Sequence, residues 1–418
     1  MTTEYIDEWP AKPRSRFRLL WLFAAVGPGL MVMLADTDAG SVITAAQSGA
    51  QWGYRMILPQ VILIPILYMI QEITVRLGTV TGKGHGQLIR ECFGMKWALL
   101  SVGTLFVSAI GALITEFSGI AGVGQLFGIP SYESVGAATV LLIGLGLTGS
   151  YRRVERIGIA VGLFEVLFVV AAFLVHPSLH AVAKGLVSIP WHQSNYIFLL
   201  AANVGAVIMP WMVFYQQGAV IDKRLSTKQM RGARLDTLGG AVATQVLMIA
   251  VVVITAATIG SAGLGRPLTD VAQIASALTP ALGAQAAKWV FGLGMLGASL
   301  IAALVVSIAG AWGVGEALGF KHSLNDRPRE AKRFYAIYSL AHIAGALLVI
   351  FSMNVVALSV DVEVLNAILL PIVLTFLLLL EAKALPAAWR MKGLYKYLVW
   401  TVSGIVMVFG VYMMFATL

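Results

Sequence analysis

The chain has 418 residues, of which 59% are hydrophobic and only 12% are charged. Soluble globular domains carry about 25% charged residues, so this composition excludes an ordinary water-soluble enzyme. A single cysteine, Cys92, excludes a disulfide framework, and the net charge of +9 by itself would suit a nucleic-acid partner. At about 20 apolar residues per span, the length has room for about eleven membrane-crossing helices. We therefore predict an all-α polytopic membrane protein.

Apolar runs between polar breaks predict the eleven helices in chain order. They cover residues 18–46, 54–80, 97–126, 135–151, 157–176, 194–220, 236–262, 286–317, 334–353, 363–382 and 396–417. With the N-terminus inside, all but four of the 29 Lys and Arg residues fall on the cytoplasmic side; the four are Arg55, Lys184, Arg266 and Lys288. This bias predicts a multi-pass protein of the cell membrane with a cytoplasmic N-terminus and an extracellular C-terminus. It also explains the basic charge without nucleic acid.

The first predicted helix is interrupted by two acids, Asp36 and Asp38, within residues 35–41. A carboxylate at mid-membrane depth costs roughly 2.5–3.5 kcal/mol and persists mainly where it lines a cavity or binds a cation. Gly40 allows the backbone to unwind there, and an unwound stretch can direct both acids toward one cavity. The sequence therefore predicts a break in helix 1 with an ion site beside it.

The sixth predicted helix carries a matching break at residues 205–211. Pro210 has no amide hydrogen, which frees a carbonyl near Ala206. Breaks in helices 1 and 6 are typical of two inverted five-helix repeats with a substrate site between them. We predict a cytoplasmic tail at 1–17, repeats at 18–176 and 194–382, and an additional helix at 396–418. The simpler alternative is a pair of packing kinks.

The motifs around these breaks resemble the Nramp family of divalent metal transporters. They are Gly-Pro-Gly at 27–29, Asp-Ala-Gly-Ser at 38–41, Gln-Trp-Gly-Tyr at 51–54, Arg-Leu-Gly at 76–78, Arg-Arg-Val-Glu at 152–155 and Met-Pro at 209–210. The resemblance implies the LeuT-type 5+5 inverted-repeat fold. It also implies a metal site on Asp38, on the Ala206 carbonyl and on the Met209 thioether, with Ser41 standing where the family has an Asn.

Four further positions match the proton route of the family, and three of them are altered. Glu116 keeps an acidic residue of helix 3, Gly119 stands where a Glu is usual, and Trp211 and Gln216 replace two histidines of helix 6. Histidine is the side chain best suited to titrate near neutral pH. We therefore predict transport without proton coupling, since the membrane potential supplies about 2.3 kcal/mol per charge per 100 mV.

The altered ligands change the expected metal. Replacing Asn by Ser41 removes an amide carbonyl and leaves room for water, while Asp36 can add an acidic oxygen through water. Glu363 aligns with a family Gln near the ion. Mg²⁺ prefers oxygen ligands and retained waters, so Met209 would line its site without coordinating it. A thioether as such favours softer metals. The set resembles the Nramp-related magnesium transporters and predicts import of hydrated Mg²⁺, with Mn²⁺ also accepted.

Three other functions stay open: a proton-coupled Mn²⁺/Fe²⁺ importer, a sodium-coupled solute symporter and a membrane-embedded metal sensor. An enzyme is not expected, because no nucleophile–base set or zinc motif is visible. We expect no cofactor, and a monomer whose partners are the metal ion and the lipid bilayer. Elsewhere we expect an i,i+4 pair of Glu72 with Arg76, a hydrogen-bonded core His342, and a Ser, Thr or water partner for Glu165.

Overall fold

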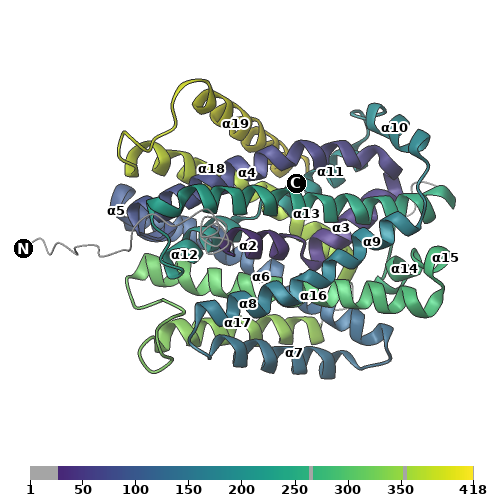
Figure 1. Cartoon of the computed structure of the whole chain (residues 1–418), viewed down its shortest axis with the longest axis horizontal. Helices are drawn as coiled ribbons and strands as arrows, with labels where there is room; N and C mark the ends of the chain where they lie inside the picture. The colour runs from purple at the N-terminus through teal and green to yellow at the C-terminus, as the bar shows by residue number, and fades with distance from the viewer. Residues whose placement is uncertain (1–26, 263–266, 352–354, 418) are drawn as a thin grey trace, which may run out of the picture.

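The computed structural model describes residues 27–262, 267–351 and 355–417, and within these ranges every regular element is helical. The helices run along the long axis of a single bundle (Figure 1). The short helix α5 (His85–Phe93) lies at one end of the bundle, and α10 (Leu179–Val187) lies at the other. These are called the α5 end and the α10 end below. The predicted tail at 1–17 is outside the described residues.

The first half of the chain forms the elements before α10. They are α2 (Pro28–Asp36), α3 (Ala39–Trp52), η1 (Gly53–Met56), α4 (Ile57–Thr81), α5, α6 (Met95–Leu126), α7 (Ser131–Gly146), α8 (Tyr151–Gly162), η2 (Leu163–Glu165) and α9 (Val166–Leu174). The first predicted helix is thus divided into α2 and α3, which confirms the predicted break. The fifth helix contains a 3₁₀ turn, η2, that the sequence did not predict.

The second half follows α10. Its elements are α11 (Ser194–Val207), α12 (Pro210–Asp222), η3 (Thr227–Gln229), α13 (Met230–Thr258), η4 (Gly260–Ala262), α14 (Val271–Ser276), α15 (Thr279–Leu282), α16 (Ala284–Leu318), α17 (Lys332–Ile350), α18 (Val355–Ala384) and α19 (Gly393–Ala416). The sixth helix is divided into α11 and α12, which confirms the second predicted break.

By length and composition, nine stretches within the described residues can cross a membrane, where the sequence predicted eleven. Two predicted spans account for the difference. The first does not stand as a separate stretch, because α3, η1 and α4 form one continuous run, Ala39–Thr81, and α2 has nine residues. The fourth, α7, has 16 residues, fewer than the roughly 20 of a perpendicular span.

Two predicted boundaries were wrong. The fourth span was expected to reach residue 151, but α7 ends at Gly146 and Gly149 turns the chain with a φ of 60°. Glu363 was expected at the start of the tenth span, whereas α18 begins eight residues earlier. The helix continues through the polar residue Asp361, which is exposed, while its neighbours Val360 and Val362 are buried.

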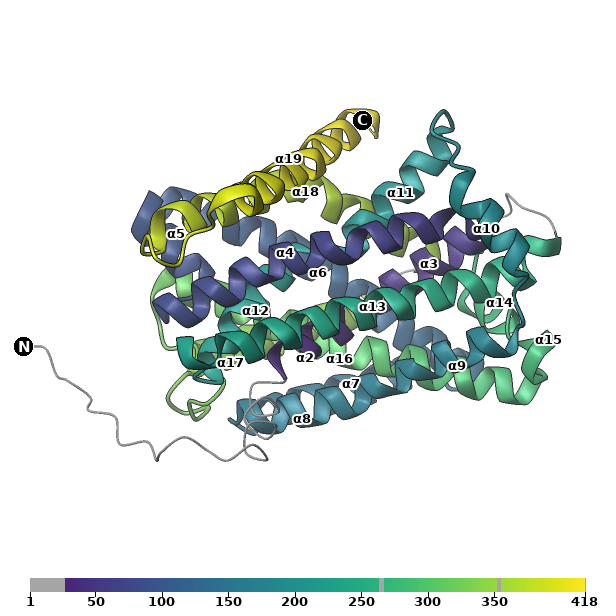
Figure 2. The same ribbon diagram turned by 45° about the horizontal axis from the view of Figure 1, so that its top comes forward.

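The broken helices lie inside a shell of long helices. Helix α13 packs against α2, α3 and α4, helix α11 packs against α18, and α16 packs against α6 (Figure 2). Helices α3 and α11, one from each half of the chain, also touch each other. The two breaks are therefore brought together in the interior, where Asp38 and Met209 are both 0% exposed.

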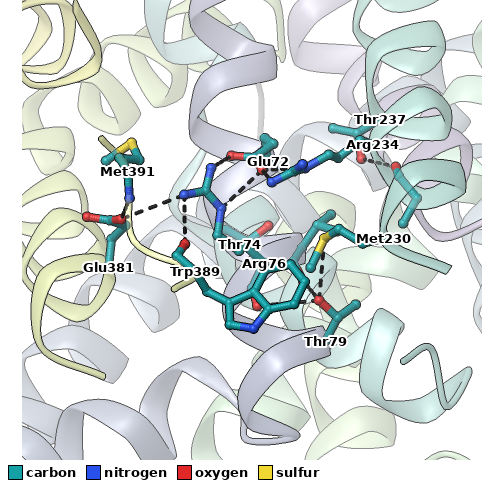
Figure 3. Close-up of polar contacts among 12 residues, drawn as sticks. Glu72, Thr74, Arg76, Thr79, Met230, Arg234, Thr237, Glu381, Trp389 and Met391 are labelled. Carbon is teal, nitrogen blue, oxygen red and sulfur yellow. Dashed lines mark hydrogen bonds and ion pairs between the residues drawn. The ribbon is translucent and has the colours of Figure 1, made fainter. Parts of the chain in front are cut away.

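An ion-pair network joins three helices near the α5 end (Figure 3). The carboxylate of Glu72 on α4 accepts hydrogen bonds from Arg76, one turn later, and from Arg234 on α13, whose Nη2 lies 2.7 Å from Oε1. Arg76 also donates to the Trp389 carbonyl at 3.2 Å and lies 3.7 Å from Glu381 on α18. The predicted Glu72–Arg76 pair is confirmed, and it is part of a larger bridge between α4, α13 and α18.

We predict that Glu72→Gln destabilises the protein by about 3 kcal/mol, because Arg76 would keep a buried charge without its main partner. The measurement is the thermal midpoint of the detergent-solubilised protein, which should fall by about 5 °C. The matched control is Glu91→Gln, which removes an exposed pair with Lys83 (2.6 Å) and should cost less than about 1 kcal/mol. Equal midpoints for the two variants would contradict a supporting role for the network.

Candidate functional site

The break in helix 1 is held by Asp38. This residue lies between α2 and α3 and caps the N-terminus of α3, where its Oδ1 accepts a hydrogen bond from the Ser41 amide at 2.7 Å. The cap explains why α3 begins at Ala39, since a carboxylate satisfies amides that have no partner in the first turn. Its other oxygen, Oδ2, is buried and has no hydrogen-bond partner among the described residues. Asp38 thus offers one free carboxylate oxygen.

The break in helix 6 is joined to the break in helix 1 by a single hydrogen bond. The Ser41 hydroxyl donates to the Ala206 carbonyl at 2.9 Å, just before α11 ends at Val207. Three of the predicted ligand residues, Asp38, Ser41 and Ala206, therefore lie together. Met209 follows in extended conformation, and its sulfur accepts a hydrogen bond from the Trp211 indole at 3.1 Å. The thioether is thereby engaged within helix 6.

Glu363 of α18 reaches the break in helix 1. A Cβ atom built on Gly40 would lie 2.2 Å from Glu363 Oε1, so the carboxylate occupies the space that a side chain would need. Glu363 Oε2 accepts from Asn366 at 2.9 Å, and Asn366 in turn accepts from Ser108 of α6 at 2.7 Å. Glu363 Oε1 has no hydrogen-bond partner in the described parts of the chain. Glu363 and Asp38 interact electrostatically, so two free carboxylate oxygens flank the break.

Asp36, the last residue of α2, turns toward α13. Its Oδ2 accepts from the Thr244 hydroxyl at 3.2 Å, and Thr244 also pairs with Thr37 at 2.7 Å. The two acids of helix 1 interact electrostatically but have different hydrogen-bond partners. Asp36 therefore anchors the end of α2 to α13, and its Oδ1 stays buried without a partner in the described residues.

The four positions matched to the proton route are all buried around the breaks. Glu116 on α6 accepts from the Ala39 amide at 3.1 Å, so it shares the capping of α3 with Asp38. A Cβ on Gly119 would lie 2.5 Å from Ser299 Oγ and 2.7 Å from Ala39 Cβ, which explains why no glutamate fits there. The remaining two, Trp211 and Gln216, bond to the Met209 sulfur and to Thr237, respectively.

The sequence did not assign a site role to Glu165, which belongs to the 3₁₀ turn η2. Its side chain is fully buried near Thr37, yet neither carboxylate oxygen has a hydrogen-bond partner in the part of the chain described here. Thr37 is nevertheless the hydroxyl residue that interacts with the Glu165 side chain, in agreement with the expected Ser or Thr neighbour. Glu165 interacts electrostatically with Asp36 and Asp38. The sequence signal was a carboxylate within an apolar run, but its distance from the break along the chain concealed the contact.

The interior thus holds five carboxylates that lack a basic partner. Within the described residues, none of the five makes an ion pair with Lys, Arg or His, and all are at most 1% exposed: Asp36, Asp38, Glu116, Glu165 and Glu363. In that same part of the chain, no three His, Cys, Asp or Glu side chains converge as a preformed metal cage. A cation at the break would complete its coordination with carbonyl oxygens or water.

Polar clamps close the bundle on both sides of the breaks. At the α10 end, Gln47 of α3 exchanges two hydrogen bonds with the backbone of Leu268, at 2.7 and 2.9 Å. Beside this clamp lies a cavity of about 490 Å³ that Asp361 and Gln51 also line. At the α5 end, Asp236 of α13 accepts hydrogen bonds from the first amides of helix 1, of which the Gly29 amide is closest at 2.7 Å.

Two discontinuous helices that meet at mid-bundle, one from each half of the chain, define the LeuT-type fold of secondary transporters. Solved structures agree: the structure resembles MhsT with a TM-score of 0.61 and 14% identity, over 96% of this chain and 98% of that one. It also resembles the manganese transporter of Eremococcus coleocola, with a TM-score of 0.76 and 18% identity, over 96% of this chain and 87% of that one. The predicted fold class is confirmed.

The chain belongs to the Nramp family: residues 29–416 match the family described as natural resistance-associated macrophage protein-like. It is 27% identical over 296 residues to the divalent metal cation transporter MntH of Vibrio campbellii, covering 68% of this chain and 69% of that one. It is 29% identical over 318 residues to MntH 1 of Pseudomonas aeruginosa, covering 71% and 70%. None of these names mentions magnesium.

We predict that Gly40→Ala abolishes metal binding, because the added methyl group would displace Glu363 from the break. The measurement is calorimetric titration of the purified protein with Mn²⁺ and Mg²⁺. The matched control is Gly239→Ala on α13, where a Cβ meets no atom within 4 Å. A Gly40→Ala variant that binds like the parent protein would show that the position of Glu363 is irrelevant to the ion.

Proposed function

We propose that the chain carries divalent metal cations across the membrane by alternating access. One observation carries the proposal: Asp38 Oδ2 and Glu363 Oε1 are buried, unpaired oxygens of two carboxylates that both approach Gly40. An uncompensated charge in a low-dielectric interior is expensive, so this arrangement favours a cation as its ligand. The names of the relatives, divalent metal cation transporters and a manganese transporter, support the same class of substrate.

We propose Mg²⁺ as a substrate, with Mn²⁺ also accepted, and a largely hydrated ion. The free donors at the break are carboxylate oxygens, and hard oxygen ligands suit both ions. The Met209 sulfur accepts the Trp211 N–H, which reduces its availability as a soft ligand. The Ser41 side chain is short and already donates to Ala206, so water has to fill the remaining coordination positions. The names of the relatives favour manganese, which makes proton-coupled Mn²⁺ import the second candidate.

We propose that transport is not coupled to protons. The two helix-6 positions where the family has histidines carry Trp211 and Gln216, which do not titrate. Of the histidines in the described spans, His342 is a core residue held by the Tyr338 carbonyl at 2.9 Å, as expected from the sequence. Outside the spans, burial lowers the pKa of His85 to about 4, so its imidazole is neutral at physiological pH. The driving force is then the metal gradient and the membrane potential.

The orientation is also a proposal: the α5 end faces the cytoplasm. Basic residues concentrate at this end, including the cluster at 152–156 in the first turns of α8 and the stretch 321–333 that leads into α17. The positive-inside bias then places the α10 end outside. The cavity lined by Asp361 would admit the ion from the outside, and an inside-negative potential would draw it inward.

We predict that Asp38→Asn removes binding of Mg²⁺ and Mn²⁺ alike, because one oxygen of the carboxylate is the charged anchor. The measurement is calorimetry followed by flux into proteoliposomes with Mg²⁺, Mn²⁺ and Ca²⁺, where the parent should transport the first two and bind Ca²⁺ weakly. The control is Glu133→Gln, an exposed carboxylate at the start of α7.

A second variant, Met209→Leu, separates the two metals. If the thioether lines the site without coordinating the ion, the Mg²⁺ and Mn²⁺ fluxes should both stay within about twofold of the parent, because leucine conserves the side-chain volume. A selective loss of Mn²⁺ flux in Met209→Leu, or a parent protein that ignores Mg²⁺, would refute the magnesium assignment and favour the second candidate. Unchanged binding in Asp38→Asn would refute the site itself.

We predict that metal uptake leaves the internal pH of proteoliposomes unchanged, since the helix-6 relay positions have no group that titrates near neutrality. The measurement is a pH-sensitive dye trapped with the metal indicator, under an imposed inside-negative potential. A protonophore should neither accelerate nor slow uptake when the potential is clamped. Acidification that follows the metal and disappears in Glu116→Gln would instead establish proton coupling.

A further inference from the structure

A second cavity lies at the α10 end and has no part in the proposed ion path. Its volume is about 510 Å³, and it opens between the turn η1, the end of α9, helix α10 and the end of α13. Aromatic side chains form one wall, small apolar residues of α13 form another, and basic residues lie around them. The cavity of Asp361, by contrast, lies among α3, α11 and α18. The two cavities share no lining residue.

The charged residues that line this cavity are all basic. Arg55 and Lys184 both line it, together with His176, and no Asp or Glu does so in the part of the chain that the structure describes. Arg55 and Lys184 are two of the four basic residues that the sequence assigns to the side poor in positive charge. Neither forms an ion pair within the described residues. Arg55 and Lys184 thus depart from the positive-inside bias, and both line the same cavity. This arrangement indicates that the cavity binds an anionic ligand.

One residue that lines the cavity, Trp52, carries a buried donor that has no acceptor among the described residues. The indole Nε1 of Trp52 is covered from solvent, yet no hydrogen-bond acceptor lies within reach in the described structure. The Trp52 ring is fixed edge-on to Tyr196, with 5.3 Å between the ring centroids. Because an unpaired buried N–H costs about 1–3 kcal/mol, this donor favours a ligand that brings an oxygen acceptor.

The walls are held close together by backbone packing. A Cβ on Gly185 of α10 would lie 2.9 Å from the backbone carbon of Tyr54 in η1, so the two elements are in direct contact only because residue 185 is glycine. Lys184 adjoins Gly185 and Arg55 adjoins Tyr54, so this contact brings both basic residues to the lining of the same cavity. The basic groups are thus positioned by the fold and do not depend on a flexible loop.

We propose that this cavity binds the phosphodiester headgroup of an anionic phospholipid. The donors Arg55, Lys184 and Trp52 Nε1 match phosphate oxygens, which accept charge-assisted hydrogen bonds. Trp52 and Tyr54 belong to the residue types that gather at the membrane–water interface, the depth at which a headgroup lies. The apolar residues Ala256 and Ala257 of α13 also line the cavity and suit the glycerol and first acyl carbons.

Native mass spectrometry of the delipidated, full-length protein tests the proposal with phosphatidylglycerol, and with phosphatidylcholine as the zwitterionic comparison. The parent should retain phosphatidylglycerol in preference. Arg55→Gln and Lys184→Gln should each weaken retention about five-fold, as expected for the loss of one basic group at an anionic lipid. The matched control is Lys288→Gln, an exposed basic residue at the same end that does not line the cavity.

Trp52→Phe provides a variant that keeps the ring and removes only the N–H, and it should weaken phosphatidylglycerol retention without altering that of phosphatidylcholine. Competition with inorganic phosphate separates the two sources of the anion: displacement of the lipid by millimolar phosphate would support the anion site but assign it to a soluble ligand. Equal phosphatidylglycerol retention by the parent and the Arg55→Gln/Lys184→Gln double variant, with unchanged thermal midpoints, would overturn the proposal.

Discussion

The structure depends on how two interrupted helices satisfy their own backbone in the middle of an apolar bundle. A backbone amide or carbonyl that finds no partner in a membrane interior costs several kcal/mol, so unwound segments survive only where protein groups or water complete their hydrogen bonds. Here the partners come from helix 1 itself, from α6 and from one hydrogen bond between the two breaks. Asp38 and Glu116 accept the first amides of α3, and Ser41 donates to the carbonyl of Ala206. The breaks are therefore one structural unit.

This unit holds more carboxylate oxygens than the hydrogen bonds of the backbone require. One oxygen of Asp38 and one of Glu363 would be enough for a divalent ion, and neither has another partner within the described residues. The contrast with the α5 end is informative. Glu72 is equally buried, but Arg76 and Arg234 compensate it within the protein. At the breaks no basic side chain of the described residues plays this role, and this difference from a structural ion pair is what the proposed ion site rests on.

The features of the fold that depend on residues close together in sequence were predicted well. The breaks at Asp38 and Pro210 follow from acids, glycine and proline within single helices, and the Glu72–Arg76 pair follows from helical spacing. The partners across the bundle followed only from the family resemblance, which placed Ala206 and Glu363 near the ion. Local residue patterns do not indicate that Glu363 fills the space beside Gly40, because 323 residues separate them. For Glu363 the apparent boundary of α18 was itself misleading.

The two clamps differ from the ion-pair network in a way that matters for movement. The clamps at Gln47 and Asp236 consist of hydrogen bonds to backbone groups, each worth about 1 kcal/mol net or somewhat more where a charge takes part. The network of Glu72 joins α4, α13 and α18 through buried charges that cost far more to separate. In the proposed alternating-access cycle, the contacts that break are the clamps at Gln47 and Asp236, because they cost less free energy to separate than the ion-pair network. Helix α2 is nine residues long, ends just before Thr37 and is tied to α13 by Asp236 and Thr244. In the proposed transport cycle, α2 swings at the α5 end while the charged network keeps its three long helices together, and this movement next to Asp38 releases the ion.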